Sequence, residues 1–224
     1  MSIDRHAGNL ERPRVTGPEE MVRTVLDFGI IPFFSNIIPG YSIEELTPGE
    51  NWFDGTEIIS DTPWDWKIAC VQSGDIAYGK FLLGGKAAFA SIRWYQELMN
   101  WRRSLPKYQP DDAQSKILAW MRDNGSIGIK EIRGLLGVKK GLADAAMARL
   151  MMQCRAVTGD ITRVYRGQDL HYNGWQTSAF CKPEDLFDLG PCPHSPTESY
   201  ELLRTHIKEI APSATDKMIN KLLD

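Results

Sequence analysis

The sequence has few of the residues that build covalent cross-links and metal sites. It contains 4 cysteines and 4 histidines in 224 residues. The cysteines (Cys70, Cys154, Cys181 and Cys192) do not form a disulfide framework at this chain length. Cys181, Cys192 and His194 are close in sequence, but their spacing matches no standard zinc site. The sequence therefore predicts reduced thiols, no metal and no cofactor.

Long apolar runs are also missing. No segment approaches the roughly 20 apolar residues that a membrane-spanning helix needs. Residues 1–15 mix Arg with Glu and lack the apolar core of a secretory signal. We therefore expect a cytoplasmic protein with no membrane partner.

Catalytic motifs are equally scarce, and the sequence leaves any catalytic residues unknown. No serine or cysteine stands in a nucleophile-elbow setting. The segment from Gly74 to Lys80 resembles the start of a phosphate-binding loop, but Phe81 follows where a magnesium-binding Ser or Thr is needed. No hydrolytic site can be argued from these patterns.

Neither sign of charge dominates the chain, whose formal net charge is −3, but the charge is uneven. Residues 111–183 hold 11 Lys and Arg against 7 Asp and Glu, whereas residues 1–110 hold 11 against 14 and residues 184–224 hold 4 against 8. A basic segment attracts phosphate-rich polymers by releasing counterions. A charge as small as +4 also occurs on ordinary solvated helical faces.

Residues 111–154 read as three short helices. Asp111 and Gln114 have the spacing of a capping pair, and Asn124-Gly125 ends this first helix. Gly128 begins a second helix that ends at Gly137. The third runs from about Lys140 to Cys154, and its inward-facing residues are predicted to be Leu142, Ala146 and Leu150.

Residues 155–165 and 170–180 read as two strands joined by a turn at Arg166-Gly167-Gln168-Asp169. Three helices followed by a hairpin are typical of a winged helix-turn-helix, whose third helix reads the DNA groove and whose hairpin is the wing. Winged helices also bind proteins, so an interaction scaffold stays open. The residues predicted to neutralise DNA phosphates are Lys139, Lys140, Arg149, Arg163 and Arg166.

The amino-terminal half has a similar order. A helix is predicted from residues 16–18 to Gly29, a second helix from Thr62 to Gly74, and a hairpin around the Gly84-Gly85 turn. The segment between the two helices, residues 33–48, is too rich in Pro and Gly for regular structure and too apolar for a solvated loop. This half therefore reads as a degenerate first winged unit.

The predicted fold class is α+β, predominantly helical, with tandem winged helix-turn-helix units and β-hairpin wings. The expected divisions are a flexible amino terminus at 1–15, a first domain at 16–108, a winged domain at 109–187 and a helical tail at 188–224. The tail contains two amphipathic helices, the first opened by a capping box from Ser195 to Glu198. They are expected to dock on the body or on a second subunit as a homodimer.

Several motifs give a resemblance that covers roughly residues 20–187. They are IPGYSIEELTP at 38–48, WDWK at 64–67, AYGKF at 77–81, KAAF at 86–89, the Arg102-Arg103 pair, and GWQTSAF with PED at 174–185. In these segments the chain resembles the bacterial AlkZ-related family. The resemblance implies kinship with AlkZ-type DNA glycosylases, which are built from tandem winged helices and excise bulky alkylated or crosslinked bases.

One departure from that pattern concerns catalysis. AlkZ-type glycosylases use a Gln-x-Gln or Gln-x-Asp pair near the amino terminus, and here the only match is Gln109-Pro110-Asp111, at the end of the proline-bearing linker at 105–110. We therefore expect a protein that binds double-stranded DNA in repair or regulation, with catalysis left open. The alternatives are a divergent glycosylase that uses an acid such as Asp61 or Asp65, and the interaction scaffold.

Overall fold

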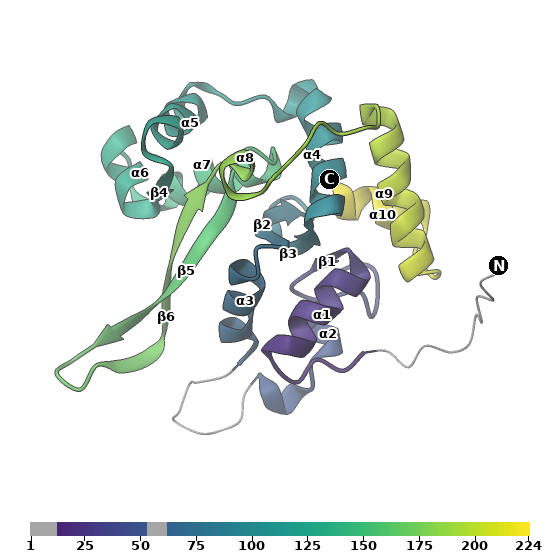
Figure 1. Cartoon of the computed structure of the whole chain (residues 1–224), viewed down its shortest axis with the longest axis horizontal. Coiled ribbons are helices and arrows are strands. Elements are labelled where there is room, and N and C mark those ends of the chain that lie inside the picture. Colours follow the sequence, from purple (N-terminus) through teal and green to yellow (C-terminus); the bar gives the residue numbers. More distant parts are fainter. Residues whose placement is uncertain (1–12, 53–61) are drawn as a thin grey trace.

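The computed structural model describes residues 13–52 and 62–224, which form a mixed α+β structure (Figure 1). Within these ranges there are two three-stranded antiparallel sheets. The helices are α1 (Pro18–Phe28), α2 (Ile43–Leu46), α3 (Pro63–Gln72), α4 (Ile92–Ser104), α5 (Asp112–Asn124), α6 (Ile129–Leu136), α7 (Lys140–Met152), α8 (Pro183–Leu186), α9 (Pro196–Ile210) and α10 (Asp216–Leu223). The strands are β1 (Ile30–Pro32), β2 (Ile76–Leu82), β3 (Lys86–Ser91), β4 (Ser126–Gly128), β5 (Val157–Arg166) and β6 (His171–Cys181).

The first sheet has the order β1-β3-β2 and includes the predicted hairpin. Its turn is at Gly84-Gly85, where φ is +66° and +100°, conformations that glycine adopts without steric cost. β1 was not predicted, because its three residues pair with β3 about sixty positions away, with Ile31 opposite Phe89. Helices α1 and α3 pack together beside this sheet.

The segment at 33–48 is packed as expected, with Phe33, Ile38 and Tyr41 buried. The expectation that it holds no regular structure is wrong at α2. Ser42 caps this short helix, since its side chain accepts a hydrogen bond from the Glu45 amide. The predicted flexible terminus falls largely outside the described residues, and in its described part Val15 is buried and its amide donates to the Leu46 carbonyl (2.9 Å).

The second sheet has the order β4-β6-β5 and is preceded in sequence by α5, α6 and α7. The predicted capping box of α5 is confirmed, because Asp111 and Gln114 bond to each other's backbone amides. The predicted inner face of α7 needs correction. Leu142 is 63% exposed, whereas Ala143, Met147 and Leu150 are buried. Both sets of residues have helical spacing, and Ala143 lies in one core cluster with apolar residues of α5 and α6.

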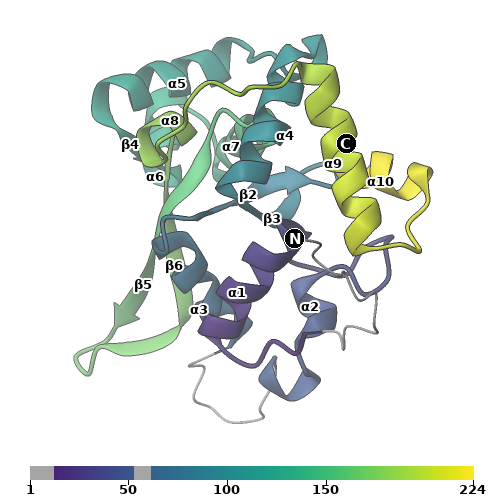
Figure 2. The same cartoon turned by 45° about the vertical axis from the view of Figure 1, so that its right-hand side comes forward.

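The two carboxyl-terminal helices pack on the body of the same chain. α9 lies along α4, and residues of α9 and α10 share a core with the first sheet (Figure 2). Arg102 of α4 is fully buried at this junction. Its guanidinium donates to the carbonyl of Met152 at the end of α7 and to that of Leu223 at the end of α10. No helix of the described ranges is long and apolar enough to cross a membrane.

Candidate nucleic-acid interface

The β5–β6 hairpin extends from the second sheet past α3 and away from the body (Figure 1). Near its base, Val157, Ile161 and Phe180 are buried, but its outer half is exposed. The turn occupies residues 167–170, slightly later than predicted, with positive φ at Gly167 and Leu170. The hairpin forms because residues with high β propensity alternate between its two faces.

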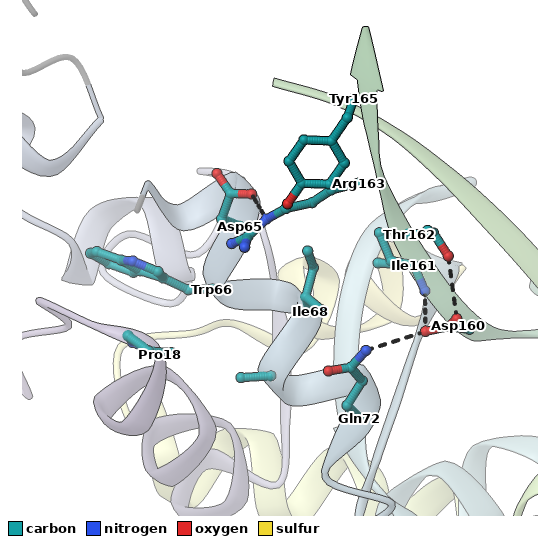
Figure 3. Close-up of a pocket in the computed structure, with 11 residues that line it drawn as sticks. Pro18, Asp65, Trp66, Ile68, Gln72, Asp160, Ile161, Thr162, Arg163 and Tyr165 are labelled. Carbon is teal, nitrogen blue, oxygen red and sulfur yellow. Dashed lines mark hydrogen bonds and ion pairs between the residues drawn. The ribbon is translucent and has the colours of Figure 1, made fainter. Parts of the chain in front are cut away.

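Asp65, in the first turn of α3, fastens the hairpin to the amino-terminal half (Figure 3). Its side chain is 2% exposed, and its Oδ1 pairs with Arg163 Nε at 3.0 Å. The same oxygen accepts hydrogen bonds from Tyr172 Oη (2.8 Å) and Gln176 Nε2 (3.1 Å). Gln176 Nε2 also lies 3.1 Å from the Trp64 carbonyl oxygen. These contacts fix the angle at which the hairpin leaves the body.

A cavity of about 600 Å³ lies where α3 meets this face of the hairpin. Asp65, Gln72 and Asp160 are among its lining residues, and Gln72 Nε2 lies 3.4 Å from Asp160 Oδ1 (Figure 3). Both acids therefore have hydrogen-bond partners within the protein. The carboxylates make this side of the hairpin unfavourable for a phosphate backbone.

Lys67 follows Asp65 by two residues on α3, and its Nζ lies 5.1 Å from the centre of the Trp64 ring. Burial lowers the pKa of this amine from 10.5 to about 8, and the negative charge of Asp65 acts in the opposite direction. Lys67 thus gives up its proton at lower pH than an ordinary exposed lysine.

The hairpin also borders a second, larger cavity of about 750 Å³. Its other walls are the end of α5, strand β4, the start of α6 and the first residue of α7. Its polar lining residues include Lys130, Glu131, Lys140 and Thr177, together with Thr162, which also lines the cavity beside α3. We call the larger cavity the hairpin groove. Two helices begin at its wall, and helix amino termini carry partial positive charge.

The outer hairpin lies beyond the hairpin groove. Trp175 precedes Thr177 by two residues and lies in the irregular part of the ladder, between the Arg163–Gln176 and Tyr165–Tyr172 pairs. Trp175 is 60% exposed, and the Arg166 guanidinium carbon lies 5.7 Å from the centre of its ring. An exposed aromatic ring with a cation stacked on it can contact both a sugar and a phosphate.

The family described as "AlkZ related" matches residues 15–224. The chain belongs to the AlkZ-related family. No curated protein and no solved structure matches it. The match begins slightly before the segment over which the sequence motifs gave the resemblance, and it also includes α9 and α10.

The five basic residues predicted for this AlkZ-related chain do not share one environment. Lys139 and Lys140 are exposed at the start of α7, where Lys140 Nζ pairs with Asp144 (2.6 Å). Arg166 is exposed near the hairpin turn. Arg149 donates to the Lys107 carbonyl and lies over Tyr108, whereas Arg163 is bonded to Asp65. The structure therefore gives Arg149 and Arg163 internal partners.

The glycosylase-like residues of this AlkZ-related chain are also bonded internally. Asp111 caps α5, and Gln109 bridges α4 and Arg155 by donating to the Arg103 carbonyl and accepting from Arg155. Asp65 is buried in the contacts described above. Asp61, the other acid considered, lies outside the described residues.

Sequence reasoning missed Lys130 and Gln176. Lys130 follows the first residue of α6, where its position at a helix start next to Gly128 was an available signal. Gln176 bonds to residues more than a hundred positions away, and no local pattern signals such a contact.

Proposed function

We propose that this protein binds double-stranded DNA as a winged helix-turn-helix, with α5, α6 and α7 as its helices and the β5–β6 hairpin as its wing. The observation that carries the proposal is the hairpin groove, where Lys130 and Lys140 stand at two helix starts opposite Thr162 and Thr177. Membership of the AlkZ-related family supports the same function.

The charges of the hairpin groove favour contact with phosphates. Ammonium groups beside helix amino termini attract anions, and the Thr177 hydroxyl can donate to a phosphate oxygen. Glu131 lines the same cavity, and Asp144 pairs with Lys140. The attraction is therefore moderate and strongly dependent on salt.

The face of α7 next to the groove favours backbone recognition over sequence reading. Its exposed first turn offers Lys139, Lys140 and the 63%-exposed Leu142, with few groups that pair with base edges. Arg166 and Trp175 extend this contact along the wing. Arg149 and Arg163 contribute positive charge, and their main contacts hold the linker and the wing.

The first sheet with α1 and α3 serves, in this proposal, as a degenerate first winged unit. Its role is to hold the wing through Asp65. The apolar faces of α9 and α10 are covered by the chain's own core, so DNA binding does not require a homodimer through these helices.

Catalysis is not needed for this function in DNA repair or regulation. Asp65 is the acid that could support a divergent glycosylase, because it lines the cavity beside α3. A carboxylate with three hydrogen bonds to one oxygen and 2% exposure is better suited to positioning the wing than to activating water.

The test is fluorescence anisotropy with a random-sequence duplex at about 50 mM salt, where phosphate contacts are strong. We expect Lys139→Glu with Lys140→Glu to weaken binding about equally for all sequences. The slope of log affinity against log salt should fall by roughly one for each phosphate that the variant no longer neutralises. Lys217→Glu with Lys221→Glu, which makes the same charge change on exposed residues of α10, is the matched control.

No binding by the unaltered protein, or equal binding by both double variants, would contradict DNA binding and favour a protein-interaction scaffold. An abasic-site assay on alkylated duplex tests the enzyme alternative. Base release above background would establish a glycosylase, and its loss in Asp65→Asn with DNA binding retained would identify Asp65 as the acid.

A further inference from the structure

Glu97, Cys192 and His194 come together at the junction of α4 with the segment that leads into α9. One candidate ligand atom from each, a carboxylate oxygen, the Sγ and a ring nitrogen, lies within 4.8 Å of the others. His194 Nδ1 is 2.8 Å from Glu97 Oε1, and Cys192 Sγ is 3.6 Å from Glu97 Oε2. Glu97 is buried at 6% exposure.

The backbone around Cys192 and His194 is held in place by the sequence itself. Proline occupies positions 191, 193 and 196, and each proline fixes its own φ angle. Asn100 Nδ2 donates to the His194 carbonyl (2.9 Å) and to Ser199 Oγ (2.8 Å). The two side chains are therefore presented to Glu97 from a stiff segment, before any ligand binds.

We infer that Glu97, Cys192 and His194 form a three-ligand zinc site. Thiolate, imidazole and carboxylate are the donors that Zn²⁺ takes in proteins, with bonds of about 2.0 to 2.3 Å. Such bonds in tetrahedral geometry separate neighbouring ligand atoms by roughly 3.3 to 3.8 Å. The 3.6 Å from Cys192 Sγ to Glu97 Oε2 fits this range, and the 2.8 Å from His194 Nδ1 to Glu97 Oε1 is about half an ångström short of it. The Cys192 and His194 atoms lie within 4.8 Å of each other, so side-chain rotation has to bring them onto one ion.

A cavity of about 340 Å³, lined in part by Gln96, Asn100 and Cys192, reaches the cluster at Cys192 and gives it an entry path. Ser199 Oγ, 2.6 Å from Glu97 Oε2, can orient the carboxylate once zinc has displaced the thiol proton of Cys192 and the ring proton of His194 lies on Nε2, away from the metal. Binding requires loss of the thiol proton, so affinity falls as pH is lowered.

The spacing of Cys181, Cys192 and His194 argued against a metal site, because the third ligand is distant in sequence. Glu97 precedes Cys192 by 95 residues, and Cys181 lies beside Gly159 in the second sheet. A bound zinc would tie the segment between α8 and α9 to α4. This role is independent of DNA binding.

The test uses the full chain, stripped with a chelator and then titrated with Zn²⁺ and with Co²⁺. We expect one zinc ion per chain by elemental analysis, a sulfur-to-cobalt charge-transfer band, and a melting temperature that rises with zinc concentration. Cys192→Ser should abolish the band, and His194→Asn should weaken zinc binding. Asn100→Ala should weaken it by roughly 10- to 100-fold, as for a residue that orients ligands.

Cys181→Ala is the matched control and should retain both the metal and the charge-transfer band. A chain that holds no zinc at micromolar concentration would overturn the inference. So would a Cys192→Ser variant with unchanged zinc affinity, because the cluster would then be a hydrogen-bonded junction only.

Discussion

Asp65 of α3 and Arg163 of β5 form an ion pair that spans 98 positions of sequence, with 3.0 Å between Oδ1 and Nε. The carboxylate is 2% exposed and the guanidinium side chain 42% exposed, so folding removes more of the hydration of Asp65 than of Arg163. The hydroxyl of Tyr172 donates to the same carboxylate oxygen (2.8 Å). The orientation of the proposed wing thus depends on one carboxylate from the other half of the chain.

Asp65→Asn should lower the free energy of unfolding by about 2 kcal/mol, because it removes a buried charge that three donors stabilise. Hydrogen exchange in the β5–β6 hairpin should become faster than in the unaltered protein, whereas exchange in α5 should change little. Urea unfolding and hydrogen-exchange mass spectrometry measure the two effects. Asp123→Asn, which alters an exposed acid paired with its neighbour Arg122, should change little. Equal effects of the two substitutions would contradict the structural role of Asp65.

Gly85→Val should destabilise the protein by roughly 1 to 3 kcal/mol. Its φ is +100°, and a Cβ at this position would lie 3.2 Å from Met152 Sδ. Gly84→Asn, where φ is +66° and no atom lies within 4 Å of the added Cβ, should cost less. Thermal unfolding of both variants checks the turn, and an unchanged melting temperature for Gly85→Val would refute it.

Trp175→Ala should weaken binding to duplex DNA by several-fold while leaving the melting temperature nearly unchanged. The ring is 60% exposed, so its removal costs little packing, but it carries the stacked Arg166 of the proposed wing. Anisotropy titrations give the affinity. Leu26→Ala, at a 42%-exposed position on α1, is the control that should bind as the unaltered chain does.

Acylation of Lys67 should follow a pH profile with a midpoint of about 8, since burial lowers the pKa of its amine from 10.5. The folded state disfavours the charged form, so the unfolded chain binds more protons between about pH 8 and 10.5. The contribution of this lysine to stability therefore rises with pH across that window. Pulsed labelling with mass spectrometry measures the profile, with the exposed Lys217 followed in the same digests. A Lys67 midpoint near 10.5 would contradict the burial effect.

Local sequence signals predicted most helices and both hairpins because their determinants lie within a few residues of each other. The Asp111–Gln114 capping box and the Gly84-Gly85 turn are of this kind. The inward face of α7 is not determined in this way, since Leu142 and Ala143 both belong to apolar series with helical spacing. Packing of α7 against α5, α6 and β2 decides between them.

The candidate sites could be predicted only in part. Basic residues at the start of α7 were visible in sequence, because charge and helix spacing are local properties. The contacts of Asp65 with the hairpin and of Glu97 with Cys192 join residues about a hundred positions apart. Such contacts depend on how the helices and sheets assemble, which no short motif determines.

The buried Arg102 couples the unfolding of three helices, α4, α7 and α10. Its positive charge is held by carbonyls at the ends of α7 and α10, where helix dipoles are negative. Opening either helix end removes a hydrogen-bond acceptor from a buried cation. The carboxyl-terminal helix α10 and the proposed DNA-reading helix α7 should therefore open cooperatively through α4. Their slowest-exchanging amides should then report one common opening event, although they lie some seventy residues apart in sequence.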